Sequence, residues 1–116
     1  MNVKIYHNPR CSKSRQTLDL IRKNGIEPEI IEYLKTPPTK ENLVTLLKAL
    51  KLSDPRAMMR TKEDPYKTEN LDNDHKSPDD LLGAIIEYPV LLERPIVITN
   101  KGTRICRPPA LVEEIL

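Results

Sequence analysis

The residues best suited to chemistry lie in a short loop that begins at His7 and contains Cys11. Cys11 falls between a predicted strand and a predicted helix that begins at Ser12. A cysteine at a helix N-terminus is close to free backbone N–H groups and to the positive end of the helix dipole, and both favour the thiolate. Cysteines in such positions have pKa values lowered from about 8.5 to roughly 3.5–7.5. The pattern therefore predicts a nucleophilic Cys11.

The same loop is suited to holding an anion. The basic residues around the cysteine are Arg10, Lys13 and Arg15. The backbone amides at the helix start, with the hydroxyls of Ser12 and Ser14, form a cradle for an oxyanion. His7 would add positive charge only where it is protonated, and a structural hydrogen-bonding role for it is equally open. A nucleophile beside an anion seat predicts attack on a tetrahedral anion or on a disulfide.

The second cysteine, Cys106, falls in a predicted strand and is expected to be a small buried hydrophobe. Ser14 stands where redox proteins of the thioredoxin type commonly carry the second cysteine of Cys-x-x-Cys, so a resolving thiol must come from elsewhere. His7 and His75 are far apart and no cysteine pair accompanies them, which predicts no metal site. Only three glycines occur, so no phosphate loop or dinucleotide motif is expected, and no bound cofactor.

Composition excludes several classes of protein. The chain has 116 residues with 19 basic and 17 acidic groups, a net charge of +2, which argues against a nucleic-acid-coating polycation. No apolar run approaches the roughly 20 residues that span a bilayer, and the N-terminus lacks a signal-like apolar stretch. These features predict a soluble, cytoplasmic protein. Both ends of the chain are basic and the middle is acidic, so the two ends are expected to build any anion site together.

The order of the predicted elements defines the fold. A strand at 3–6, a helix from Ser12 to Gly25 and a strand at 29–34 form a parallel crossover. Near the C-terminus, strands at 95–99 and 103–106 flank a turn at 100–102, and a short helix follows at 111–116. We therefore predict an α/β, thioredoxin-like fold, with a four-stranded mixed sheet and flanking helices.

Residues 35–93 are predicted to be a helical insertion between the second and third strands. Leucines with helical spacing begin at Leu43, and Asp54-Pro55 and Ser77-Pro78 each pair a capping residue with a proline that suits the first helical position. The insertion is tightly joined to the rest of the chain, and residues 1–116 are expected to form a single domain.

The loop at 7–18 resembles the active-site signature of the glutaredoxin-coupled, glutathione-dependent arsenate reductases. The resemblance covers nearly the whole chain and is to the shorter branch of that family. It continues through the segments 33–34, 36–38, 59–63, 93–97 and 107–109.

The resemblance implies a thioredoxin-like fold and three arginines around the oxyanion, at Arg60, Arg94 and Arg107. Planar guanidinium forks suit a tetrahedral dianion and the charge that develops in its transition state. A cis bond between Arg94 and Pro95 is implied as well.

Arsenate reduction is the leading hypothesis. In it the Cys11 thiolate attacks arsenic, the three arginines hold the anion, and His7 and Ser14 help to lower the thiol pKa. Glutathione, as co-substrate, then attacks the adduct, and glutaredoxin completes the cycle. One alternative is a monothiol oxidoreductase for glutathione mixed disulfides. Another is a thioredoxin-like adaptor that binds RNA polymerase, although that branch usually carries Cys-x-x-Cys and Ser14 counts against it.

Overall fold

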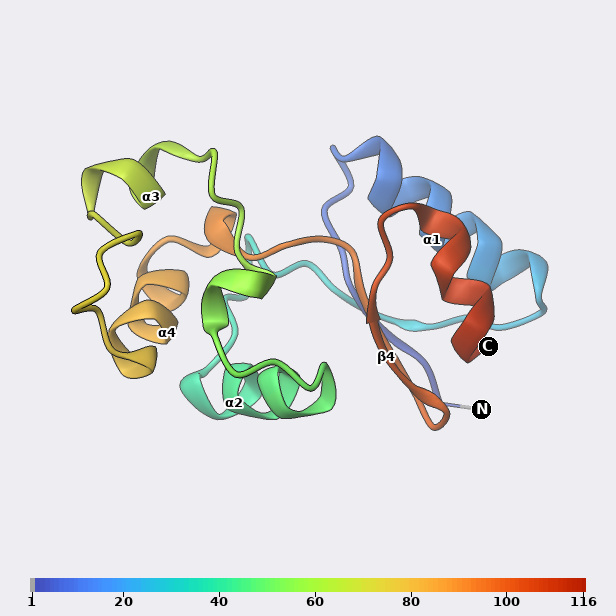
Figure 1. The fold of residues 1–116 in the computed structure, drawn as a ribbon. Helices are drawn as coiled ribbons and strands as arrows, with labels where there is room; N and C mark the ends of the chain where they lie inside the picture. The colour runs from blue at the N-terminus through green and yellow to red at the C-terminus, as the bar shows by residue number, and fades with distance from the viewer. Residues whose placement is uncertain (1) are drawn as a thin grey trace. The chain divides into compact units, whose positions relative to one another are not determined.

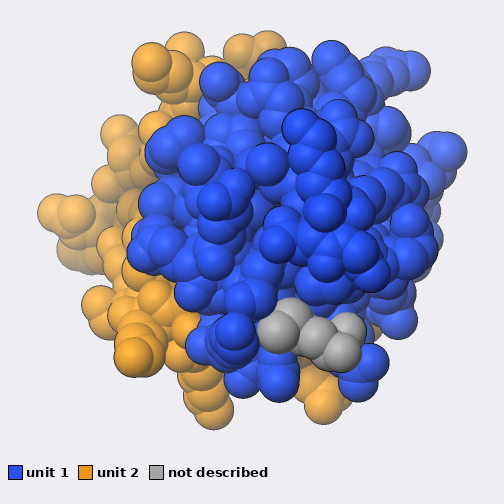
Figure 2. All heavy atoms as spheres, turned by 90° about the vertical axis from the view of Figure 1, so that its right-hand side faces the viewer, with its two compact units in different colours: residues 1–36, 94–116 blue, residues 37–93 orange. Residues whose placement is uncertain are grey.

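The computed structural model describes residues 2–116, and the chain folds into two compact units. Residues 1–36 and 94–116 form unit 1, and residues 37–93 form unit 2 (Figures 1 and 2). Unit 1 thus joins the two basic ends of the chain, while the predicted helical insertion is compact by itself. None of the helices within 2–116 is long and apolar enough to cross a membrane.

The sheet of unit 1 has four strands in the order β2-β1-β3-β4. Strand β1 pairs in parallel with β2 and antiparallel with β3, and β3 pairs antiparallel with β4. The mixed sheet and its flanking helices confirm the predicted fold class. The strand bounds are Lys4–Tyr6 for β1, Glu29–Ile31 for β2, Ile96–Thr99 for β3 and Gly102–Ile105 for β4.

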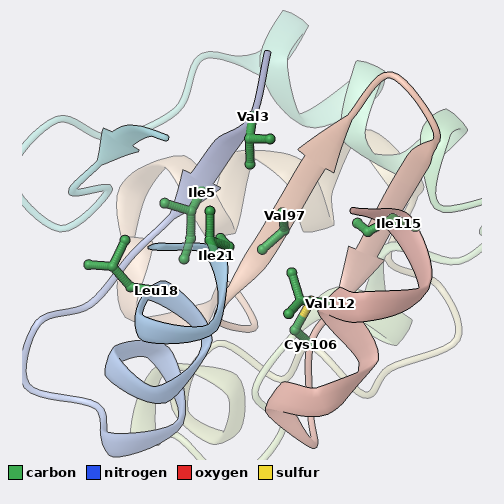
Figure 3. Close-up of a cluster of buried hydrophobic side chains, with 8 residues drawn as sticks. All are labelled: Val3, Ile5, Leu18, Ile21, Val97, Cys106, Val112 and Ile115. Atoms are coloured by element: carbon green, nitrogen blue, oxygen red, sulfur yellow. The ribbon is translucent and has the colours of Figure 1, made fainter. Parts of the chain in front are cut away.

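Two helices pack against each other in unit 1, namely α1 (Ser12–Lys23) and the 3₁₀ helix η3 (Pro109–Ile115). Their apolar side chains join those of alternate strand residues, which point to one face of the sheet. Figure 3 shows the resulting core. It consists of Val3, Ile5, Leu18, Ile21, Val97, Cys106, Val112 and Ile115.

Several predicted boundaries in unit 1 are wrong. The second strand ends at Ile31 rather than residue 34, because the chain turns at Glu32, whose carbonyl accepts hydrogen bonds from two backbone N–H groups three and four residues later. Strand β4 starts and ends one residue earlier than predicted, so Cys106 follows the strand. The closing helix is a 3₁₀ helix that begins at Pro109.

Unit 2 consists of short helices. They are α2 (Lys40–Ala49), η1 (Pro55–Met58), α3 (Asp64–Thr68), α4 (Pro78–Glu87) and η2 (Pro89–Leu91). Helices α2 and α4 pack together, and each begins with a capping box, at Thr39 and at Ser77. The predicted caps at Asp54 and Ser77 are confirmed.

Unit 2 also holds two extended segments that pair with each other, at Met59 and at Leu92. Met59 forms an isolated antiparallel bridge with Leu92, and the N–H of Arg60 donates to the carbonyl of Leu91 at 2.7 Å. The N–H of Glu93 donates to the carbonyl of Met58 at 2.9 Å. These bonds fix the backbone that leads into Arg60.

Candidate active site

The loop between β1 and α1 is held by its own hydrogen bonds. The N–H of Cys11 donates to the carbonyl of Asn8 at 3.0 Å, and the N–H of Arg10 donates to Asn8 Oδ1 at 3.0 Å. Arg15 closes the loop from the helix, since its Nη1 donates to the carbonyl of Pro9 at 2.9 Å. The loop is therefore a defined turn that presents Cys11 at the N-cap of α1.

Cys11 is partly exposed, and its pKa is lowered from the ordinary thiol value. Partial burial opposes the change, because it raises the pKa of the thiol and is the largest single influence. The backbone amide of Ser14, the charge of Arg94, the backbone amide of Lys13 and the side chain of Arg107 together outweigh it. The helix start thus favours the thiolate, as the sequence predicts, whereas the positive charges come from Arg94 and Arg107 rather than from the basic residues beside Cys11 in the sequence.

Two of the three predicted arginines lie in unit 1 with the cysteine. Arg107 Nη1 is 4.0 Å from Cys11 Sγ, at the outer limit for a hydrogen bond to sulfur, and donates to the Arg94 carbonyl at 3.2 Å. Both arginines precede prolines through cis peptide bonds, at Arg94–Pro95 as expected and also at Arg107–Pro108. The structure therefore brings Arg94 and Arg107 together beside the sulfur from opposite ends of the β3–β4 hairpin.

Ser14 and His7 form a buried pair behind the loop. Ser14 Oγ lies 2.6 Å from His7 Nδ1 and accepts a hydrogen bond from the N–H of Asn8 at 3.1 Å. Ser14 is fully buried and His7 is 5% exposed. The hydroxyl thus joins the end of β1 to the first turn of α1, and so fixes the amide that stabilises the Cys11 thiolate.

The His7 ring is harder to protonate than an ordinary imidazole. Burial lowers the pKa of His7, Glu32 opposes the change, and the charges of Arg22 and Arg15 reinforce it. A protonated His7 is therefore not the source of positive charge for Cys11, and its contact with the loop passes through Ser14. The catalytic roles of His7 and Ser14 stay predictions.

Cys106 has the opposite environment. Its side chain is fully buried in the core of unit 1, and its Sγ lies 3.6 Å from the carbonyl oxygen of Arg104. Burial raises the pKa of Cys106 to about 12, against a smaller opposite effect from Arg104. The prediction that Cys106 is a small buried hydrophobe is confirmed, while the side chain of the neighbouring Arg107 approaches the Cys11 sulfur.

Arg60, the third predicted arginine, lies in unit 2. Its Nη2 forms an ion pair with Glu63 Oε1 at 2.7 Å, and both side chains are about one-quarter exposed, at 24% and 28%. Its place in an anion site with Arg94 and Arg107 stays a prediction. Sequence reasoning missed the partner role of Glu63, although Glu63 is in the segment that carries the family resemblance.

The sheet order and the loop cysteine at the start of α1 define a thioredoxin-like protein. The model of the ArsC family matches residues 6–115. The chain therefore belongs to the ArsC family.

Relatives agree with this assignment. An arsenate reductase from Vibrio cholerae has the same fold with a TM-score of 0.97 and 52% identity, over all of this chain and 98% of that one. The uncharacterized protein YfgD of Escherichia coli (strain K12) is 52% identical over 98% of this chain and 96% of its own length. An arsenate reductase of the same strain is 47% identical over 99% of this chain and 81% of its own length.

Proposed function

We propose that this protein reduces arsenate to arsenite with glutathione and glutaredoxin as the sources of electrons. The observation that carries the proposal is the Cys11 thiol, whose pKa is lowered beside Arg94 and Arg107 in a chain of the ArsC family. An activated thiolate and permanently charged guanidinium groups are what a thiol attack on a tetrahedral anion needs.

In the first step the Cys11 thiolate attacks arsenic. A sulfur–arsenic bond forms, and one arsenate oxygen leaves as water after taking up protons from solvent. Arsenic remains pentavalent in this adduct. Arg94 and Arg107 bind the remaining oxygens and stabilise the charge that develops on them, and the resemblance adds Arg60 to this set.

In the second step the thiol of glutathione attacks the adduct. The two sulfurs together give up two electrons and form a mixed disulfide between Cys11 and glutathione, while arsenic is reduced to arsenite and leaves. Ser14 stands in place of a local second cysteine and Cys106 is buried away from the loop, so an external thiol has to serve. Glutaredoxin then reduces the mixed disulfide and regenerates the Cys11 thiolate.

The test is arsenite release from arsenate with glutathione and glutaredoxin supplied. Wild-type protein should turn over, omission of glutaredoxin should stop the cycle at the mixed disulfide, and Cys11→Ser should give no arsenite. Wild-type turnover no higher than that of Cys11→Ser would exclude arsenate reduction.

A second candidate is a monothiol oxidoreductase that exchanges glutathione mixed disulfides. It is favoured by the same observation of a single activated cysteine, but it needs no oxyanion site. Arg94→Ala separates the two candidates, since arsenate reduction should fall far more than disulfide exchange. Equal losses in both assays would favour the disulfide activity.

A further inference from the structure

The ion pair between Arg60 and Glu63 places a carboxylate beside one of the guanidinium groups that the proposed function assigns to the oxyanion. The two residues are joined twice. Arg60 Nη2 meets Glu63 Oε1 at 2.7 Å, and the N–H of Glu63 donates to the carbonyl of Arg60 at 3.3 Å. An anion that binds the Arg60 guanidinium therefore lies close to the Glu63 carboxylate.

The geometry of this pair is defined from both sides. The backbone of Arg60 is fixed by the Leu91 carbonyl, next to the bridge between Met59 and Leu92. Glu63 is the N-cap of α3, but its side chain makes no capping hydrogen bond and turns to Arg60 instead. The contact joins Nη2 of Arg60 to Oε1 of Glu63, and a guanidinium group offers five N–H donors in all, more than one carboxylate can accept.

A carboxylate in an anion site discriminates between anions that carry an O–H group and anions that do not. It repels an anion that has only bare oxygens, but it accepts a hydrogen bond from an anion that carries an O–H group. Arsenate and phosphate carry at least one O–H near neutral pH, whereas sulfate carries none. A site built to accept a hydrogen bond from a ligand O–H rejects the analogue that lacks it.

We propose that Glu63 is a specificity-determining residue, which selects protonated tetrahedral oxyanions of the arsenate and phosphate type against sulfate. This inference rests on the proposed function in one respect only, namely that Arg60 binds the oxyanion. Glu63 positions the Arg60 guanidinium, and it also distinguishes protonated from unprotonated anions bound to that guanidinium.

The test is isothermal titration of phosphate and of sulfate into the full-length protein at constant ionic strength. Phosphate is chosen because it shares the charge and shape of arsenate but does not react with the thiol. Wild-type protein should prefer phosphate by about tenfold or more. Glu63→Gln removes the negative charge, so sulfate should bind more tightly and the preference should fall at least fivefold.

Two variants complete the experiment. Glu41→Gln makes the same chemical change at an exposed position on the first turn of α2, and it should keep the wild-type preference. Arg60→Ala should weaken both anions together, because it removes the guanidinium that binds them. Circular dichroism and thermal unfolding verify that each variant is folded.

The inference is overturned if Glu63→Gln keeps the wild-type preference, or if both affinities change by the same factor, which is the result of a purely structural role. It is also overturned if the wild-type protein does not distinguish the two anions, or if Arg60→Ala leaves phosphate binding unchanged. Arsenite release is measured separately on the same wild-type protein, so failure of the selectivity and failure of the proposed function are distinguishable.

Discussion

The two cysteines of unit 1 show how strongly the surroundings of a thiol determine its chemistry. Cys11 lies in the loop before α1, where backbone amides and two guanidinium groups lower its pKa in spite of partial burial. Cys106 lies just after β4, fully buried among aliphatic side chains, and its pKa is raised to about 12. The same side chain is a nucleophile in one place and a small hydrophobe in the other.

The difference in pKa comes from the groups that surround each cysteine, not from the cysteine side chain itself. Arg107 contributes to the environment of Cys11 but not to that of its chain neighbour Cys106. Its side chain approaches Cys11 Sγ, while the Cys106 side chain lies in the core. Partial exposure leaves Cys11 open to a substrate and an external thiol. Complete burial keeps both the substrate and the external thiol away from Cys106. The comparison therefore predicts that only one cysteine takes part in turnover.

The largest effect is expected from replacing each cysteine in turn. Cys11→Ser should lose arsenate reduction completely, because a hydroxyl is not ionised by the groups that stabilise the thiolate. Cys106→Ser should keep at least about half of the activity at temperatures where it stays folded, with some loss of stability from the buried hydroxyl. Arsenite release measures both variants.

Mass spectrometry of the protein after reaction with arsenate and glutathione sharpens this comparison. The glutathione mass should appear on the peptide that contains Cys11. An internal disulfide between Cys11 and Cys106, together with loss of activity in Cys106→Ser, would replace the external thiol by an intramolecular one.

The next effect concerns the guanidinium groups that distinguish the Cys11 environment. Arg94→Lys should lower kcat/KM for arsenate on the order of a hundredfold, because a point charge does not reproduce a bidentate fork on the developing oxyanion. It should also reduce the rise in Tm that arsenate or phosphate gives by mass action. Arg104→Lys, on β4, makes the same change at a partly exposed position paired with Glu114 and should alter neither quantity. Full activity and full anion protection in Arg94→Lys would disprove the role of the fork.

A smaller effect is expected behind the loop. Ser14→Ala removes the hydroxyl shared by His7 and the N–H of Asn8, and leaves buried polar groups without their partner. The free energy of unfolding should fall by about 1–3 kcal/mol. The Cys11 pKa should rise, since the first turn of α1 is less firmly held. Denaturant unfolding and the pH dependence of alkylation by iodoacetamide measure the two effects, and a variant with unchanged values of both would show that the pair is incidental.

The smallest effect is the dependence of stability on pH that Cys106 produces. Its folded pKa is raised, so between the unfolded value, about 8.5, and the folded value the unfolded chain binds fewer protons and stability falls as pH rises. The stability advantage of wild type over Cys106→Ala should therefore shrink by about 1 kcal/mol between about pH 9 and about pH 10. Denaturant unfolding at the two pH values measures it. A constant difference would mean that Cys106 ionises as readily in the core as in the unfolded chain.

One part of the Cys11 environment was predictable from the sequence, because the backbone amides of Lys13 and Ser14 at the helix start are local. The strand and helix periodicities on either side of Cys11 are clear, whereas the two guanidinium groups that lower its pKa, those of Arg94 and Arg107, are distant in the sequence. The fold class followed from the same periodicities, since a strand-helix-strand crossover and a hairpin leave few topologies.

Other features depended on tertiary structure. The contact of Arg107 with the Arg94 carbonyl joins residues at opposite ends of a hairpin, and no local pattern specifies it. The second strand was predicted too long, because Tyr33 and Leu34 continue an apolar run that the turn at Glu32 interrupts. The protonation of His7 was left open by the sequence, because the burial that lowers its pKa is not visible in a sequence. Glu63, the carboxylate partner of Arg60, was missed because no sequence pattern assigned a function to it.

The central claim is that the loop and the guanidinium groups beside it lower the pKa of Cys11 below that of an ordinary thiol. The most direct measurement is the ultraviolet absorbance of the thiolate as a function of pH in Cys106→Ser, with the double variant Cys11→Ser/Cys106→Ser as the blank. An apparent pKa well below about 8.5 is predicted, and it should rise when Arg107 is also replaced by alanine. A Cys11 pKa at or above about 8.5 would contradict the account.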